Sequence, residues 1–177
     1  MAQTSGTVAF GAVPTQVGDV LVAVTEDGVV ATDFRDSADV RTRIVARLGL
    51  TVVDDPERTA QTRAEVAAYF AGSLRSGFTV AVDWRLMSTA QRLVLGTLYE
   101  TVPFGQVVTY GELARRSGST IPARGIGSIM GSNPIPIIVA CHRVVAGTGL
   151  GGFSGGDGVE SKQVLLALEG QLPAALW

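Results

Sequence analysis

The chain holds one cysteine, Cys141, and one histidine, His142, and the two are adjacent. A single cysteine cannot form an intrachain disulfide, and one Cys with one His cannot complete the usual four-ligand zinc site. The fold must therefore rest on a hydrophobic core. With 177 residues, 46% of them apolar, and a formal net charge of −2, the chain can build that core as one domain or two small ones.

The pattern of apolar residues argues against a membrane protein. The longest apolar run, residues 135–140, has six residues including a proline and is typical of a buried strand. A helix that crosses a bilayer needs about 20 apolar residues. The first residues also lack the charged and apolar regions of a signal peptide. We therefore expect a cytoplasmic protein that makes no membrane contact.

Charge divides the chain into two unequal halves. Residues 1–100 hold nine Arg against twelve acidic residues, a net charge of −3. Residues 101–177 hold four Arg and one Lys against four acidic residues, a net charge of +1. An anionic partner is expected to prefer the second half.

The first half combines strand and helix patterns. Runs of β-branched residues on either side of Glu26-Asp27-Gly28 predict a hairpin, and apolar residues at helical spacing predict two helices, the first closed by Gly49. Predicted strands cover residues 20–24, 29–34 and 51–53, and predicted helices cover residues 40–48 and 59–74. Residues 76–83 form the expected link between a small N-terminal α/β domain, residues 1–82, and a C-terminal domain, residues 83–177.

The second half is predicted to be mainly helical. Predicted helices cover residues 88–99, 110–116 and 123–130. Ser88 or Thr89 caps the first of these helices, Thr109 caps the second, and Pro122 opens the third. The inward side chains expected on the first helix are Leu93, Val94, Leu95 and Leu98.

The second and third of these helices form a helix-turn-helix candidate. The pair carries Arg115, Arg116 and Arg124 against one acidic residue, Glu112. Residues 123–132 contain three glycines and two serines, a poor helix by propensity. Such small residues serve either close packing within the fold or close approach to a groove, and composition favours neither.

Cys141 and His142 follow the apolar run directly. A thiolate is the reactive form of cysteine, and a neighbouring histidine can take the thiol proton directly or through water. Adjacent residues on a regular strand point to opposite faces, so a water bridge suits this pair better than direct contact. The plainer interpretation is a small buried thiol beside a hydrogen-bonded histidine.

The sequence around the pair resembles the active-site signature of the O6-alkylguanine-DNA alkyltransferases (methylated-DNA–protein-cysteine methyltransferases). The signature covers Asn133-Pro134-Ile135-Pro136 through Cys141-His142-Arg143-Val144-Val145. Further segments are similar to the family's helix-turn-helix, pocket loop and closing helix, and they lie at residues 109–114, 123–133, 153–156 and 162–170. The resemblance covers roughly residues 66–171. The chain departs from the family pattern at Ala140, where proline is usual, and at Phe153, where tyrosine is usual. Ala90 and Leu95 are smaller than the residues usual in an aromatic-rich segment, and the stretch of residues 156–162 is slightly longer than usual.

The resemblance implies DNA repair by direct reversal, with an alkyl group transferred once from O6-alkylguanine, or O4-alkylthymine, to Cys141. It implies a relay of Glu169, His142, water and Cys141, with Asn133 holding the turn before the cysteine. Arg124 is expected to fill the place of the flipped base, and Tyr110 to assist its extrusion. The remaining residues expected at the lesion or the DNA are Met130, Val144, Phe153, Ser154, Gln91 and Ser119.

The implied partner is double-stranded DNA containing the damaged guanine, bound by a monomer that uses no cofactor and no metal. Three other functions stay open. They are a lesion-binding protein without transfer activity, a helix-turn-helix transcription regulator, and an unrelated thiol hydrolase. Few side chains on the glycine-rich helix can read bases in the major groove, which weakens the regulator interpretation. Only alkyl transfer predicts a mass gain on Cys141.

Overall fold

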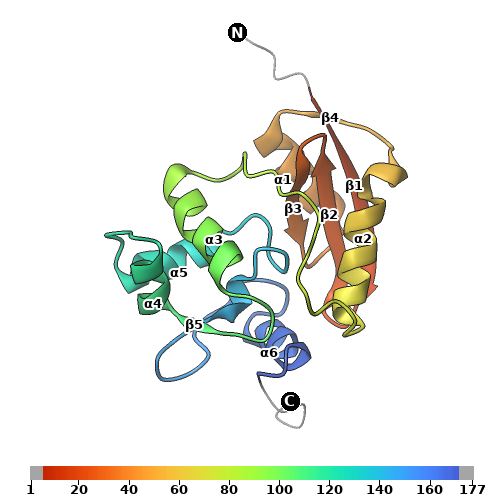
Figure 1. The fold of residues 1–177 in the computed structure, drawn as a ribbon. Helices are drawn as coiled ribbons and strands as arrows, with labels where there is room; N and C mark the ends of the chain where they lie inside the picture. The colour runs from red at the N-terminus through yellow and green to blue at the C-terminus, as the bar shows by residue number, and fades with distance from the viewer. Residues whose placement is uncertain (1–5, 172–177) are drawn as a thin grey trace.

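The computed structural model describes residues 6–171 and shows a mixed α/β fold (Figure 1). The first half contains strands β1 (Thr7–Thr15), β2 (Gly18–Thr25), β3 (Gly28–Asp33) and β4 (Thr51–Val52), and helices α1 (Ala38–Leu48) and α2 (Pro56–Phe70). The second half contains helices α3 (Thr89–Thr101), α4 (Tyr110–Arg116), α5 (Ala123–Gly131) and α6 (Val159–Leu168), strands β5 (Val108–Thr109) and β6 (Val144–Val145), and the 3₁₀ helix η1 (Cys141–Arg143). No helix within residues 6–171 is long and apolar enough to cross a membrane.

The four strands of the first half form one sheet in the order β3-β2-β1-β4. The β1–β2 and β2–β3 pairs are antiparallel, whereas β1 and β4 are parallel. The predicted hairpin is confirmed. Strand β1 was not predicted, because Gly11 and Pro14 interrupt its apolar pattern and both residues are unfavourable in strands. Gly11 favours close packing on α2, since a Cβ there would lie 2.8 Å from the Arg63 side chain and 2.9 Å from the Thr59 hydroxyl.

Local sequence signals set the ends of the helices. Ser37 caps α1 by accepting a hydrogen bond from a backbone N–H, and Gly49 ends it in the left-handed conformation, as predicted. Helix α2 begins at Pro56, earlier than predicted, because Asp55 supplies the N-cap and proline suits the first turn. It ends at Phe70 rather than residue 74, and Gly72 follows with φ of 77°.

Helix α3 begins with a capping box, in which Ser88 and Gln91 each bind the other's backbone N–H. The prediction that Leu93 faces inward is wrong, because its exposed fraction is 47%. Successive residues of an α-helix are rotated by about 100°, so three consecutive apolar residues cannot share one narrow face. Val94, Leu95 and Leu98 are buried, and Leu93 lies on the opposite side.

The prediction of a buried strand over residues 135–140 is also wrong. The segment is buried, but it forms a series of turns in which Ile137 adopts φ of 76°. Pro134 and Pro136 lack the N–H groups that a ladder needs. Their carbonyl groups instead accept hydrogen bonds from Thr32 of β3, from its backbone N–H to Pro134 (3.0 Å) and from its hydroxyl to Pro136 (2.6 Å). The edge of the N-terminal sheet thus holds the segment before the cysteine.

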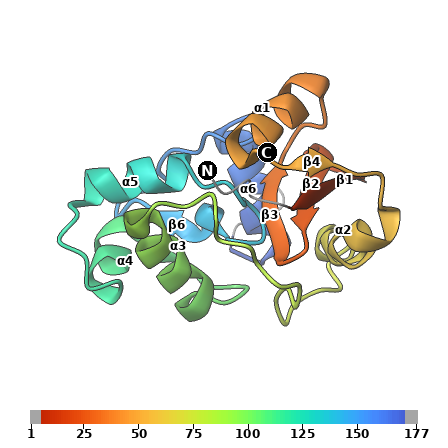
Figure 2. The same ribbon diagram turned by 90° about the horizontal axis from the view of Figure 1, so that it is seen from above.

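The sheet is buried on both faces. Helix α1 covers one face through Val40 and Ile44. The other face packs on α2 and on parts of the second half, including Ile137 and Leu165 of α6. Figure 2 shows α6 between the sheet and the group α3, α4 and α5. The two halves therefore share core residues.

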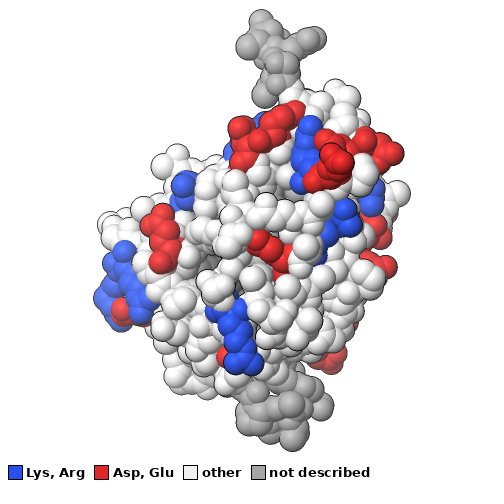
Figure 3. Space-filling model, turned by 45° about the vertical axis from the view of Figure 1, so that its right-hand side comes forward, with Lys and Arg blue, Asp and Glu red and all other residues white. Residues whose placement is uncertain are grey.

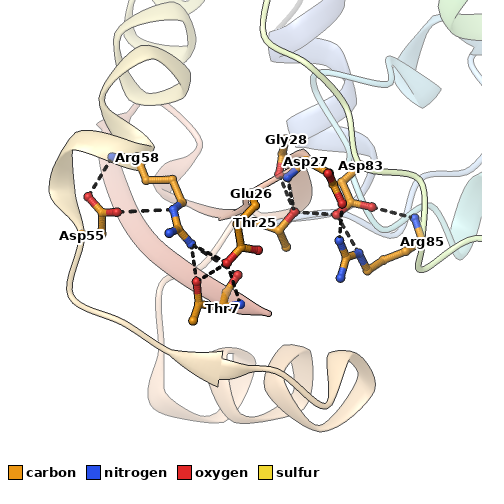
Figure 4. Close-up of polar contacts among 9 residues, drawn as sticks. All are labelled: Thr7, Thr25, Glu26, Asp27, Gly28, Asp55, Arg58, Asp83 and Arg85. Atoms are coloured by element: carbon orange, nitrogen blue, oxygen red, sulfur yellow. Dashed lines mark hydrogen bonds and ion pairs between the residues drawn. The ribbon is translucent and has the colours of Figure 1, made fainter. Parts of the chain in front are cut away.

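The connection between α2 and α3 is tied to the β2–β3 turn. The buried carboxylate of Asp83 accepts a hydrogen bond from the Thr25 hydroxyl (2.5 Å) and pairs with Arg85 (2.7 Å) (Figure 4). Arg85 also pairs with Asp27 on the turn (2.8 Å). At Gly28, a Cβ would lie 2.4 Å from a backbone carbonyl oxygen of the connection, so only glycine permits this approach.

Candidate active site

Cys141 begins the 3₁₀ helix η1, and Asn133 shapes the turns that lead to it. The Asn133 side chain accepts a hydrogen bond from the backbone N–H of Ile135 (2.9 Å) and donates one to the carbonyl of Val139 (2.8 Å). The Cys141 N–H donates to the same Val139 carbonyl (2.8 Å). One side chain therefore bridges both ends of the buried segment and places the cysteine.

His142 and Glu169 form a buried pair next to the cysteine. The imidazole Nε2 makes a short hydrogen bond with Glu169 Oε2, and neither side chain is more than 1% exposed. Glu169 is the C-cap residue of α6. Its other oxygen, Oε1, accepts hydrogen bonds from Arg143 Nε (2.7 Å) and from the backbone N–H of Gly105 (3.2 Å).

The surroundings of Glu169 keep it ionised. Burial raises the pKa of this carboxyl, but the hydrogen bond from His142, the charge of its imidazolium at low pH, the charge of Arg143 and the hydrogen bond from Tyr69 outweigh burial and hold the pKa at about 2. Arg143 also donates to the Val102 carbonyl (2.8 Å), which fixes its guanidinium against the carboxylate. The site thus contains a fixed negative charge on one side of the imidazole.

These contacts leave one basic nitrogen on the imidazole. Burial lowers the pKa of His142, so the ring is neutral at pH 7. A neutral imidazole that donates through Nε2–H to Glu169 keeps its lone pair on Nδ1. Nδ1 is buried and has no hydrogen-bond partner among residues 6–171. His142 is therefore arranged to accept a proton at Nδ1.

The thiol of Cys141 needs such an acceptor. Burial raises its pKa, while a hydrogen bond with the Asn133 side chain and the charge of Lys162 act in the opposite direction. The side chain is 5% exposed and free of any disulfide. Without a base, a buried thiol remains protonated and weakly nucleophilic.

Tyr69 and Lys162 belong to this site, although the sequence reasoning assigned neither a role. The Tyr69 hydroxyl, from α2 in the first half, donates to Glu169 Oε2 (2.9 Å) and lies 3.4 Å from His142 Nε2. Burial and the charge of Glu169 raise its pKa well above the ordinary value, which keeps the hydroxyl protonated. The sequence gives no signal for this role, because a tyrosine on an apolar helix face is usually an ordinary core residue.

Lys162 is fully buried and donates from Nζ to three backbone carbonyls, those of Val144 (2.7 Å), Leu150 (2.6 Å) and Gly152 (3.1 Å). Burial lowers its pKa to about 8. All three carbonyls lie between Cys141 and Phe153, so Lys162 gathers this loop beside the cysteine. The available signal was that this is the only lysine of the chain and stands within an apolar helix.

A cavity of about 380 Å³ opens beside the thiol. Its lining residues come from α4, α5, η1 and the loop before α6, and they are Tyr110, Gly127, Met130, Gly131, Cys141, Gly152, Phe153 and Ser154. Ser154 is held there by a hydrogen bond from its hydroxyl to the Gly131 carbonyl (3.2 Å). Tyr110 packs closely on Gly151, because a Cβ on Gly151 would lie 2.8 Å from the Tyr110 hydroxyl. Gly151 has φ of 74°, which also favours glycine. Cys141 thus lies in the wall of a cavity that is lined mainly by apolar and small residues.

Three other predicted binding residues lie outside the cavity, and Val144 lies close to Cys141 in the core. Arg124 is exposed in the first turn of α5, and Ser119 is half-buried in the turn before it. Gln91 is engaged in the capping box of α3 and in a hydrogen bond to the Ser132 hydroxyl (2.9 Å). Val144 is buried. The structure thus brings Cys141, His142, Asn133 and Glu169 together, and it places Arg124, Ser119 and Gln91 outside the cavity.

Charges on the protein surface are mixed in sign. Figure 3 shows basic and acidic side chains scattered over one face, without a large patch of either sign. Within α4, Glu112 pairs with both Arg115 and Arg116. In the part of the chain that the structure describes, no three His, Cys, Asp or Glu side chains lie close enough to hold a metal ion.

A mixed α/β fold that buries a lone cysteine beside a histidine–carboxylate pair is typical of proteins that use a thiol as nucleophile. The family model described as "6-O-methylguanine DNA methyltransferase, DNA binding domain" matches residues 89–171. A methylated-DNA–protein-cysteine methyltransferase of Mycolicibacterium paratuberculosis is 42% identical over 125 residues, which cover 70% of this chain and 72% of the relative. A protein of the same name from Methanosarcina acetivorans is 32% identical over 158 residues, covering 87% and 93% of the two chains.

Solved structures agree with these relatives. The crystal structure of Mycobacterium tuberculosis O6-methylguanine methyltransferase has a TM-score of 0.76 and 32% identity, covering 94% of this chain and 96% of the other. That of M. tuberculosis OGT in complex with DNA has a TM-score of 0.74 and 32% identity, covering 96% of this chain and 97% of the other. The chain belongs to the family of methylated-DNA–protein-cysteine methyltransferases.

Proposed function

We propose that the protein repairs alkylated DNA by moving the alkyl group from O6-alkylguanine to its own Cys141. The observation that carries this function is a buried thiol that opens onto a cavity and lies beside a proton-accepting imidazole. Family membership supports it, as do the names of the relatives and the likeness to a structure of M. tuberculosis OGT in complex with DNA.

The reaction is a displacement at the carbon attached to O6. The thiol proton leaves toward His142 Nδ1, directly or through a water, while Glu169 stabilises the imidazolium that forms. The sulfur attacks the alkyl carbon, so an S–C bond forms as the O6–C bond breaks. Guanine then takes up a proton at N1, which balances the one lost from the thiol.

Each molecule acts once. A thioether, unlike a disulfide, cannot be reduced by thiol exchange, and the chain has no second cysteine to displace the alkyl group. The alkylated protein is therefore the end product.

Binding of DNA is assigned to α4 and α5, which form the proposed helix-turn-helix of a DNA-binding and alkyl-acceptor domain, residues 83–177. Residues 1–82 form the supporting domain.

An enzyme can react with a stacked base only after flipping that base out of the duplex. The exposed Arg124 at the start of α5 is suited to fill the space that the flipped base leaves. Gly125 serves packing within the fold, since a Cβ there would lie 2.5 Å from the Ile121 side chain, whereas Gly127 lines the cavity. The flipped guanine enters the cavity between Tyr110, Met130 and Phe153. The protein works as a monomer on double-stranded DNA.

Intact-mass measurement tests the transfer. After incubation with a duplex that contains O6-methylguanine, we expect one methyl group per protein and no further turnover, and we expect Cys141→Ser to remain unmodified. Unmodified wild-type protein that still binds the lesion would identify a lesion-binding protein without transfer activity. Sustained turnover beyond one equivalent would refute the single-use mechanism.

A second comparison tests Arg124. Arg124→Ala should slow repair of a duplex far more than alkylation by free O6-benzylguanine, because a free base needs no flipping. Equal slowing of both reactions would place Arg124 in the cavity or the fold instead.

A further inference from the structure

A second cavity of about 410 Å³ reaches the same cysteine from the side of the N-terminal half. Five residues line both cavities, and they are Met130, Gly131, Cys141, Phe153 and Ser154. The remaining lining of the second cavity comes largely from β3, α1 and the turns around Pro134. The two cavities therefore share Cys141 and its neighbours, and the rest of each is lined by a different part of the fold.

The proposed function, on which this inference rests, divides the substrate between the two cavities. The guanine base occupies the cavity next to Tyr110, and the carbon under attack lies at the sulfur. Whatever is attached to that carbon must then point away from the base, and the second cavity is the space available to it. The size and charge of this second cavity set which O6 substituents fit.

Two aromatic residues line the second cavity. Phe34, which follows β3, packs edge-on against Phe153 with ring centroids 5.7 Å apart and an interplanar angle of 86°. Phe34 is only 3% exposed, so its position is fixed by the core. An aromatic ring in the substituent would gain further edge or stacked contacts with these two rings.

The part of the second cavity that α1 lines is cationic. Arg43 and Arg47 line it, four residues apart and so on the same face of α1, against one acidic residue, Asp33. Arg43 Nη2 lies 3.3 Å from Asp33 Oδ2. Arg47 donates to the Leu86 carbonyl (3.3 Å) and makes no ion pair within residues 6–171. The lining thus carries one positive charge in excess.

We propose that this second cavity is a substituent site in which Arg43 and Arg47 favour O6 substituents that carry an aromatic ring and end in an anion. The chemical class is a guanine with an O6-benzyl group bearing a carboxylate at the far position. The N-terminal half then selects substrates as well as supporting the fold.

Free nucleobases test this proposal without the negative charge of DNA. The probes are O6-(4-carboxybenzyl)guanine and O6-[4-(aminomethyl)benzyl]guanine, with the rate of benzyl transfer to Cys141 followed by intact mass at low ionic strength. Because the lining carries one positive charge in excess, we expect the carboxylate to react faster by roughly fivefold, the upper range for one exposed charge pair. Arg43→Gln with Arg47→Gln removes both positive charges and leaves Asp33, so the ratio of the two rates should fall below one. High salt should reduce the ratio in the wild type.

Arg41→Gln is the matched control, because Arg41 is also on α1 but pairs with Asp36 and lies outside this cavity. It should keep the wild-type ratio. Equal rates for the two probes in the wild type would overturn the proposal, as would a ratio that Arg43→Gln with Arg47→Gln leaves unchanged. Failure of the proposed function is recognised separately, since the protein would then not take a methyl group from methylated duplex DNA.

Discussion

Replacing Tyr69 with phenylalanine tests whether a residue of the N-terminal half stabilises Glu169 and sets the pKa of His142. The substitution keeps the ring, which packs edge-on against Phe70 and Phe104 with centroids 5.3 and 6.1 Å away, and leaves no cavity. It removes only the hydroxyl that donates to Glu169 Oε2 (2.9 Å). His142, Arg143 and the Gly105 N–H still satisfy the carboxylate.

The magnitude follows from the type of bond that is lost. A hydrogen bond to a charged group contributes about 1.5–3 kcal/mol to stability. Since three other donors remain on Glu169, we expect a loss near the lower end, about 1.5 kcal/mol. Urea denaturation at pH 7.5 measures this loss as a lower midpoint with an unchanged m-value.

The same substitution should shift the pH dependence of alkyl transfer. Tyr69 and His142 bind the same oxygen of Glu169, so loss of the hydroxyl leaves that charge to act on the imidazole alone. The pKa of His142 then rises, and the acid side of the pH–rate profile moves to higher pH. Tyr99→Phe is the matched control, because Tyr99 is half-buried outside the site and should change neither measurement. Stability within about 0.5 kcal/mol of wild type, together with an unmoved acid limb, would refute the reasoning.

Three further predictions concern stability and DNA binding. Glu169 has a pKa of about 2 against an ordinary 4.5, so its contribution to stability, about 3 kcal/mol, is complete above pH 4.5 and is lost as pH falls toward 2. Because the pKa of His142 is also lowered, a further loss of stability begins as pH falls below its ordinary pKa of 6.5. Urea titrations at stepped pH should show both losses of stability, and Glu169→Gln should remove the one between pH 4.5 and pH 2. Thr32→Val should cost about 1–3 kcal/mol by leaving the Pro136 carbonyl unpaired, and Thr32→Ser should restore most of it; equal midpoints for the two variants would contradict this. Because Glu112 already pairs with Arg115 and Arg116, binding to undamaged duplex should show a slope of log affinity against log salt of only about −2 to −3, and a slope near −6 would contradict this.

Elements with strong local signals were predictable from the sequence. The hairpin around Gly28, the cap at Ser88 and the start of α4 at Thr109 all appear where turn and capping residues placed them. These features depend on residues within a few positions of each other, so one stretch of sequence contains the whole signal. The resemblance to a known family added Glu169, which no local pattern links to the cysteine.

The errors have a different physical origin. The buried segment 135–140 is apolar like a strand, but its prolines remove ladder donors and its partner is the distant Thr32. Tyr69 and Lys162 gain their roles from contacts 100 and 18 residues away along the chain, respectively, so neither local propensity nor periodicity indicates them. The conformation of segment 135–140 and the roles of Tyr69 and Lys162 depend on long-range hydrogen bonds, which local sequence patterns do not indicate.

The shared core also imposes an order of events during synthesis. The ribosome delivers Thr32 and Tyr69 well before their partners Pro136 and Glu169, and the sheet face that receives Ile137 and Leu165 is completed only when α6 has emerged. Chains fold from the N-terminus as they are made, at about 5–20 residues per second. A nascent chain that already contains Cys141 therefore lacks, for about 1–6 s, the carboxylate that orients its base, because Glu169 is made 28 residues later. The thiol gains its proton acceptor in final form only when the fold closes around it, so a truncated translation product would carry the cysteine without its reactivity.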